Sequence, residues 1–320
     1  MTQNIKFIIG TSHFGASINY KNSEKFLKTA YDIGIRNIDT APMYGNYKSE
    51  KIIGQIIKKN NLQFKIFTKV GLEGKKINNF FYAKKIKLTE KNIISSVDRS
   101  LKNLGCEKID LLQLHYFDDQ TDIKKTMSAV TSLIKLGKIN KYGICNYNYL
   151  ELTKLIKFIK KYNLPKPFSC QVHYNLIERR AERYILPYLK KHKINIFANR
   201  VFSMGILSGQ YKSKSNFPKK SRAKKSLRIS KLINRNIIQI SHGLNSFAKY
   251  KKLETIDLSI NWLKKNKMIN KIIFGISNID QFKNLAKIKK INDEDLNQLN
   301  KILRKYNNII KNKPDKFLIL

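Results

Sequence analysis

Short apolar runs alternate along the chain with amphipathic segments, and this alternation is its main structural signal. Between the runs, apolar residues recur at spacings of three and four, as on one face of a helix. The predicted strands are Phe7–Gly10, Asn37–Asp39, Lys65–Val70, Asp110–His115, Lys141–Ile144, Ser169–His173, Ile194–Arg200 and Lys271–Phe274. The predicted helices are Ser23–Ile33, Lys48–Lys59, Glu90–Leu104, Asp122–Leu136, Leu150–Tyr162, Arg180–His192, Asp257–Lys265 and Asp280–Lys287, with Ser23 and Asp280 as N-caps.

Strict alternation of strands and helices predicts an α/β fold, a (β/α)8 TIM barrel. A doubly wound sheet is the alternative, but it usually carries a G-x-G-x-x-G turn after its first strand. Here the first strand continues as Gly10-Thr11-Ser12-His13-Phe14-Gly15, which lacks that spacing. No linker rich in Pro, Gly or Ser divides the chain, so we expect a single domain over residues 1–320.

Three segments depart from the repeat. Gly71–Lys87 follows the third predicted strand and Ser208–Ser230 follows the seventh. Both long loops therefore leave the C-terminal face of the barrel, where active sites of this fold are built. Asp293–Lys311 has the pattern of an extra C-terminal helix.

Four chemically active residues lie at or just after predicted strand ends. Asp39, Lys69 and His115 close the second, third and fourth strands, and Tyr44 lies in the turn after Asp39. In a parallel sheet the carboxyl ends of neighbouring strands meet at one edge. An acid, a phenol, an amine and an imidazole would then share one pocket. Each alone has an ordinary structural explanation, but together they indicate a site.

The chemistry of these four residues suits a carbonyl group. A free phenol with a pKa near 10 is a poor proton donor at neutral pH. We expect the ammonium of Lys69 to lower the pKa of Tyr44, with Asp39 holding Lys69 charged. His115 could donate to a carbonyl oxygen and fix its angle. None of the four supplies a hydride, so a nicotinamide cofactor is required.

The chain is strongly basic, with a formal net charge of +42. Such a charge suggests an anionic partner such as nucleic acid. Only ten of the 64 basic residues are arginine, however, and base recognition relies heavily on arginine. Lysine shares A/T-rich codons with the abundant Asn, Ile, Tyr and Phe. We therefore interpret the charge as compositional and expect no specific nucleic-acid partner, with nucleic-acid binding kept as an alternative.

The remaining composition favours a cytoplasmic protein. Residues 1–7 have no apolar signal segment, and no stretch approaches the ~18 apolar residues of a membrane helix. The three cysteines are scattered and show no metal-binding spacing, which is typical of a reducing compartment. We expect no membrane association and no metal. The sequence favours neither a monomer nor a homo-oligomer.

Several motifs resemble the aldo-keto reductase family. The strongest is Gly34–Gly45, which reads G-I-R-N-I-D-T-A-P-M-Y-G and is followed by Ser49-Glu50. Further similarity lies in Thr68-Lys69, Asp110–His115, Gly137–Ile139, Gly143–Asn146, Gln171–Asn175, Gly205–Gly209 and Gly275–Asn278. The resemblance covers nearly the whole chain in order, and it implies the same (β/α)8 barrel.

The resemblance implies a reversible hydride transfer between a nicotinamide and an aldehyde or ketone, sugars included. Tyr44 would be the general acid in reduction and the base in oxidation, tuned by Asp39 and Lys69, with His115 orienting the carbonyl. Asn146 and Gln171 would hold the nicotinamide carboxamide. The full set implied to contact the cofactor is Gly10, Thr11, Asp39, Cys145, Asn146, Gln171, Arg200, Ser208, Gly275, Ser277, Gln281 and Asn284.

Some of these positions differ from the family pattern. Cys145 stands where the family often has Ser, and Arg200 occupies the stretch in which many members carry a stacking Tyr. The family's usual Lys and Arg for the 2′-phosphate are replaced by Gly275 or Ile276 and by Gln281. We expect NADPH as the cofactor and keep NADH open. A non-catalytic, nucleotide-binding regulatory subunit of the same fold is the alternative function. The substrate loops, which vary most between relatives, are Gly71–Lys87, Tyr116–Thr121 and Ser208–Ser230.

Overall fold

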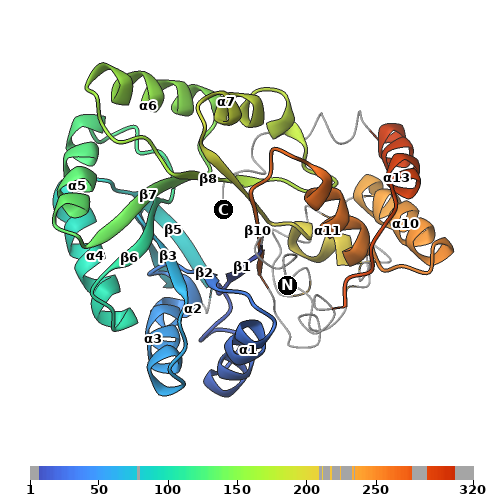
Figure 1. Ribbon diagram of the computed structural model, residues 1–320, viewed down its shortest axis with the longest axis horizontal. Helices are drawn as coiled ribbons and strands as arrows, with labels where there is room; N and C mark the ends of the chain where they lie inside the picture. Colours follow the sequence, from blue (N-terminus) through green and yellow to red (C-terminus); the bar gives the residue numbers. More distant parts are fainter. Residues whose placement is uncertain are drawn as a thin grey trace.

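The computed structural model describes residues 7–77, 80–208, 211, 217, 224, 233, 235–275 and 287–306. Within these ranges, eight parallel strands close into a barrel in the order β1-β10-β9-β8-β7-β6-β3-β2 (Figure 1). The strands are β1 (Phe7–Gly10), β2 (Asn37–Asp39), β3 (Lys65–Val70), β6 (Ile109–Leu114), β7 (Ile139–Cys145), β8 (Ser169–His173), β9 (Asn195–Asn199) and β10 (Lys271–Gly275). The predicted TIM barrel is confirmed, and the doubly wound alternative is wrong because the sheet has no open edge.

Helices surround this barrel and follow the strands in sequence (Figure 1). They are α1 (Tyr20–Asp32), α2 (Tyr44–Tyr47), α3 (Ser49–Lys59), α4 (Glu90–Leu104), α5 (Ile123–Lys135), α6 (Tyr149–Lys161), α7 (Ile185–Lys191), α10 (Arg235–Tyr250), α11 (Thr255–Lys265) and α13 (Asp293–Lys305), with 3-10 turns η2 (Arg180–Glu182) and η3 (Ser203–Ser208). The extra C-terminal helix is confirmed as α13, which buries Leu296, Leu299 and Leu303. The predicted helix Asp280–Lys287 and its N-cap Asp280 lie outside the described residues, apart from Lys287.

Three helix predictions differ from the structure. Asn19, not Ser23, caps α1, because the Asn19 side chain accepts a hydrogen bond from the backbone N–H of Asn22. The predicted helix Arg180–His192 is divided into η2 and α7. Pro187 explains the division, since a proline without an N–H fits only the first turn of a helix. Helix α10 was absent from the predicted set, although its buried residues have helical spacing.

The predicted long loop after β3 contains two strands. Strands β4 (Leu72–Ile77) and β5 (Phe80–Ile86) pair antiparallel as a hairpin at the C-terminal face. The Tyr47 hydroxyl donates to the carbonyl oxygen of Gly74 at 2.8 Å. The hairpin is therefore tied to α2, the turn that carries Tyr44.

The core has two parts, separated by the strands. The larger part lies between the strands and the helices. The smaller part fills the barrel interior and consists of Ile8, Phe67, Leu111, Phe197 and Ile273, with Phe168 against it. Because side chains alternate across a strand, interior residues recur every second position. This period places the next interior side chains nearer the C-terminal face.

Candidate active site

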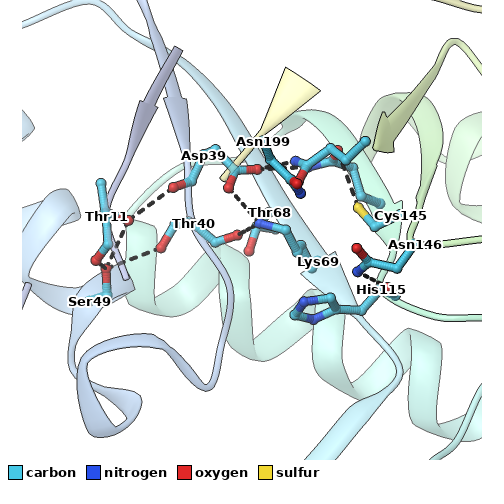
Figure 2. A network of polar contacts seen from close by, with 12 residues as sticks. Thr11, Asp39, Thr40, Ser49, Thr68, Lys69, His115, Cys145, Asn146 and Asn199 are labelled. Carbon is cyan, nitrogen blue, oxygen red and sulfur yellow. Dashed lines mark hydrogen bonds and ion pairs between the residues drawn. The ribbon is translucent and has the colours of Figure 1, made fainter. Parts of the chain in front are cut away.

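The interior above this apolar cluster is polar. Two residues further along their strands than Phe67, Leu111 and Phe197 lie Lys69, Gln113 and Asn199. Asp39, Cys145 and Gln171 lie in the same polar layer, joined to them by hydrogen bonds (Figure 2). The barrel thus gathers Asp39 and Lys69, two of the strand-end residues predicted from the sequence, into one hydrogen-bonded group.

Asp39 and Lys69 form a buried ion pair at the centre of this layer. The Lys69 ammonium lies 2.7 Å from Asp39 Oδ2, and the two side chains are 1% and 5% exposed. It also donates to the carbonyl oxygen of Thr40 at 2.8 Å. Asp39 Oδ1 accepts from the amides of Gln113, at 3.0 Å, and Gln171. A carboxylate only accepts hydrogen bonds, so these contacts fix which amide atom faces Asp39.

Tyr44 is placed beside this pair by a tight turn. Lys69 Nζ lies 4.7 Å from the centroid of the Tyr44 ring. Gly45, the next residue, has φ +58°, and a Cβ there would lie 1.6 Å from the carbonyl oxygen of Phe14. Only glycine fits this conformation and this close approach. Gly45 therefore fixes the turn that brings the phenol to the pair.

Burial raises the pKa of Tyr44 to about 12, although the nearby Lys69 opposes the rise. The expected net lowering is therefore wrong for this structure: desolvation of a phenolate outweighs the attraction of the ammonium. Burial by itself would lower the pKa of Lys69, but the attractions of Asp39, Tyr44 and Cys145 together outweigh burial and leave that pKa raised. Lys69 is thus a permanent cation, and Tyr44 keeps its proton at neutral pH.

His115 faces the phenol from the other side. His115 is 7% exposed, and its ring meets the Tyr44 ring edge-on, with centroids 6.3 Å apart. Tyr116 stacks on it at 5.2 Å. Burial, with Lys69 and Arg200 adding to it, lowers the pKa of His115 well below its ordinary value. The imidazole is neutral and can donate one N–H.

Three amides line the next strand ends. Asn146 has φ 60° and donates from Nδ2 to the carbonyl oxygen of His115 at 3.1 Å. Asn199 donates from Nδ2 to Gln171 Oε1 at 3.3 Å. Among the described residues, no donor reaches the buried Oδ1 atoms of Asn146 and Asn199. Each is an acceptor awaiting an N–H.

The other residues implied to contact a cofactor are spread around the same face. Gly10 pairs with Gly275, and a Cβ on Gly275 would meet only Ser12 Oγ, at 3.9 Å. The Thr11 hydroxyl donates to the carbonyl oxygen of Asp39 at 3.1 Å. The Cys145 thiol contacts Gln113 Oε1 at 3.6 Å.

Arg200 is half-buried just after β9, with φ 51°, and Ser208 ends η3. Ser277, Gln281 and Asn284 lie outside the described residues, so the predicted adenosine contacts stay predictions.

Sequence reasoning missed Gln113 and Asn199. Gln113 is fully buried and donates to Asp39. Asn199 donates to Gln171, the second amide that donates to Asp39. The signal was present, because Gln113 lies two residues before His115 and therefore on the same strand face. A polar residue at a buried interior position needs a partner.

Other features of the described residues lie apart from this group. A hollow of about 410 Å³ opens between the start of α5 and α6 and includes none of the four predicted catalytic residues. No cluster of His, Cys, Asp or Glu in the described ranges could hold a metal ion. The helices of the same ranges include none long and apolar enough to cross a membrane.

Comparison with known proteins agrees with this geometry. Residues 6–304 match the model of the aldo/keto reductase family. The chain therefore belongs to this family and is an oxidoreductase of a class that uses nicotinamide cofactors.

Its relatives include aldo-keto reductase YhdN of Bacillus subtilis, 28% identical over 92% of this chain and 87% of that protein. A putative aryl-alcohol dehydrogenase, AAD16 of Saccharomyces cerevisiae, is 29% identical over 75% of this chain and 74% of its own. Among solved structures, glycerol dehydrogenase AKR11B4 from Gluconobacter oxydans is similar, with a TM-score of 0.80, 23% identity and coverage of 97% and 94%. That last similarity supports the fold.

Proposed function

We propose that the protein reduces the carbonyl group of an aldehyde or ketone, reversibly, with NADPH as cofactor. Tyr44 gives a proton to the carbonyl oxygen in reduction and takes it back in oxidation. The observation that carries the proposal is the Lys69 ammonium, which lies 2.7 Å from the Asp39 carboxylate and 4.7 Å from the centroid of the Tyr44 ring. A fixed cation beside a phenol stabilises the phenolate left after proton transfer.

His115 is proposed to orient the substrate. Its neutral imidazole lies edge-on to the Tyr44 ring, so an oxygen between the two rings would meet an O–H and an N–H donor. Two donors aimed at one oxygen stabilise the charge that develops on it. A neutral imidazole can do this without competing with Tyr44 for the proton.

The residues present fit a nicotinamide. A carboxamide NH2 group has two N–H donors, and the buried Oδ1 atoms of Asn146 and Asn199 are acceptors that lack one. Gln171 uses one N–H on Asp39 and one lone pair on Asn199, so it keeps one of each for a ligand. When bound, the nicotinamide supplies the hydride that these side chains cannot.

The preference for NADPH over NADH follows the family resemblance. The candidates for positive charge at the 2′-phosphate are Lys283, Lys212, Lys214 and Arg222, which lie outside the described residues. The test is to measure the dissociation constant of each cofactor from the change in its fluorescence on binding. Equal affinity for both would contradict the preference without touching the proposed chemistry.

The main test compares NADPH oxidation by wild type and Tyr44→Phe across a panel of aldehydes, ketones and open-chain sugars. Loss of the proton donor should lower turnover by roughly 10²–10⁴-fold. Tyr250→Phe is the matched control, since Tyr250 is 79% exposed on α10. Equal rates for wild type and Tyr44→Phe would overturn the assigned mechanism.

The second candidate is a nucleotide-binding regulatory subunit without turnover. Thr11 and Gly10 would serve it equally well, because cofactor binding alone does not need Tyr44. It predicts tight NADPH binding with no oxidation on any carbonyl of the panel. The presence of all four predicted catalytic residues, Asp39, Tyr44, Lys69 and His115, favours the enzyme, since a purely regulatory site does not need a buried ion pair beside a phenol. Location in the cytoplasm stays a prediction.

A further inference from the structure

The sequence Gln-x-His occurs on two alternate strands of the barrel. Gln113-Leu114-His115 ends β6, and Gln171-Val172-His173 ends β8. Both glutamines donate to the same oxygen, Asp39 Oδ1. Interior layers of this fold are formed by side chains from alternate strands. The two motifs therefore occupy equivalent places on either side of β7.

His115 and His173 each lie one layer above the glutamine of their own strand. His173 is therefore the counterpart of His115 on β8. Gln171 points into the barrel, and two positions further along a strand the side chain returns to the same face. His173 also pairs with Asn199 in the β8–β9 register. Leu114 pairs with Ile144 and Cys145 with Gln171, so His173 lies two strands across and two residues further along than His115, with the two backbones about 12 Å apart. Both imidazoles project from these backbones toward the same barrel interior.

Both rings are buried, yet neither is used by the protein. His115 and His173 are 7% and 8% exposed. In the part of the chain that the structure describes, no side chain or backbone group hydrogen-bonds to either imidazole. Among the described residues, the fully buried polar atoms without a partner do not include these ring nitrogens, so the nitrogens reach the open interior of the barrel, where a ligand can meet them. For His115 that ligand is the carbonyl oxygen already proposed.

We propose that His173 binds a hydroxyl group next to the substrate carbonyl, which makes α-hydroxy aldehydes and α-hydroxy ketones the preferred substrate class. This inference rests on the proposed function, because it places the carbonyl at His115 and Tyr44. Two oxygens on adjacent carbons would then meet the two imidazoles. The open-chain forms of sugars belong to this class.

The charge state of His173 suits a hydroxyl. Burial, with Arg200, Arg180 and His115 adding to it, lowers the pKa of His173 well below its ordinary value. A neutral imidazole has one N–H donor and one acceptor nitrogen, and a hydroxyl also has both. A carboxylate or phosphate would use only the donor. The groups around His173 thus match an uncharged polar oxygen.

The kinetic test uses substrate pairs that differ by one hydroxyl: glycolaldehyde against acetaldehyde, and hydroxyacetone against acetone. The readout is the ratio of kcat/KM within each pair. Wild type should prefer the hydroxylated member by about tenfold, the size of one hydrogen bond to a substrate. His173→Leu should bring the ratio near one. His173→Gln, which keeps a donor and an acceptor, should retain part of the preference.

His192→Leu is the matched control, because His192 caps the far end of α7 on the surface and should leave the ratio as in wild type. An unchanged ratio in His173→Leu would overturn the proposal, as would a wild-type ratio near one. Failure of the proposed function looks different: wild type would then oxidise NADPH with neither member of either pair.

A binding measurement tests His173 even without turnover. The chain has only five histidines, so ring signals of histidine-labelled protein can be assigned with His115→Phe and His173→Leu by NMR. Glycolamide carries a hydroxyl beside a carbonyl that is not reduced, and acetamide lacks the hydroxyl. With or without NADPH, glycolamide should shift both signals and acetamide only that of His115. A His173 signal that glycolamide leaves in place would overturn the proposal.

Discussion

The ammonium of Lys69 is held by the carboxylate of Asp39 at 2.7 Å, with almost no solvent around either group. Lys69→Met would leave Asp39 as an uncompensated buried charge, which typically costs about 3–5 kcal/mol. We expect the free energy of unfolding in urea to fall by that order. The double variant Asp39→Asn/Lys69→Met should recover most of the loss, because both charges are gone. An equal loss in the single and double variants would show that the charge pair does not set the stability.

The raised pKa of Tyr44, about 12, predicts how the rate depends on pH. The phenol stays protonated from neutral to moderately alkaline pH, so carbonyl reduction should show no loss from Tyr44 below about pH 10. Oxidation needs the phenolate, so its rate should rise about tenfold per pH unit over the same range. The measurement is kcat/KM against pH in both directions. A fall in reduction centred near pH 8 would contradict the assignment.

The lowered pKa values of His115 and His173 predict that stability depends on pH. Unfolding returns each imidazole to an ordinary pKa near 6.5, so below this pH the unfolded chain binds more protons than the folded one. Stability is therefore complete above pH 6.5 and falls as pH drops towards the folded pKa. The slope is about 1.4 kcal/mol per pH unit for each histidine. His173→Leu should reduce the slope between about pH 6.5 and 5 by one proton; a slope equal to that of wild type would count against burial of a neutral imidazole.

Two glycines with similar backbones separate strain from steric clash. Gly45 and Gly137 have φ +58° and +71°. A Cβ on Gly45 would lie 1.6 Å from the carbonyl oxygen of Phe14, whereas a Cβ on Gly137 would meet nothing within 4 Å. Gly137→Ala should cost about 1–2 kcal/mol of stability from backbone strain alone. Gly45→Ala should cost more and also lower turnover, because the Tyr44 turn must move. Denaturant unfolding and NADPH oxidation measure the two effects. Equal stability losses with full activity in both variants would mean that Gly45 does not position Tyr44.

Much of the fold could be predicted because apolar periodicity follows burial directly. Strands β1, β2, β3 and β8 and helix α4 begin and end at the predicted residues. The cap of α1 was less predictable, since Asn19 and Ser23 are both good capping residues and only the chain geometry chooses between them. The division near Pro187 and helix α10 both had local signals, a proline and apolar residues at helical spacing, which the prediction did not use.

The site was predictable where strand ends carried reactive side chains, as at Asp39, Lys69 and His115. The net pKa of Tyr44 was not, because it depends on how much solvent the folded barrel removes from the phenol. Gln113 and His173 were missed because sequence reading treats strands one at a time. Their significance appears only when β6 and β8 are placed on either side of β7 in the closed barrel.

The polar layer around Asp39 contains Gln113 and Gln171, and the two imidazoles of His115 and His173 lie two residues further along the same strands. A substitution at the level of His173 changes what a substrate meets, and it leaves the buried charges two residues below unaltered. Related barrels can thus differ in substrate preference while they carry out the same reaction. Substrate preference and proton transfer can therefore be altered independently of each other.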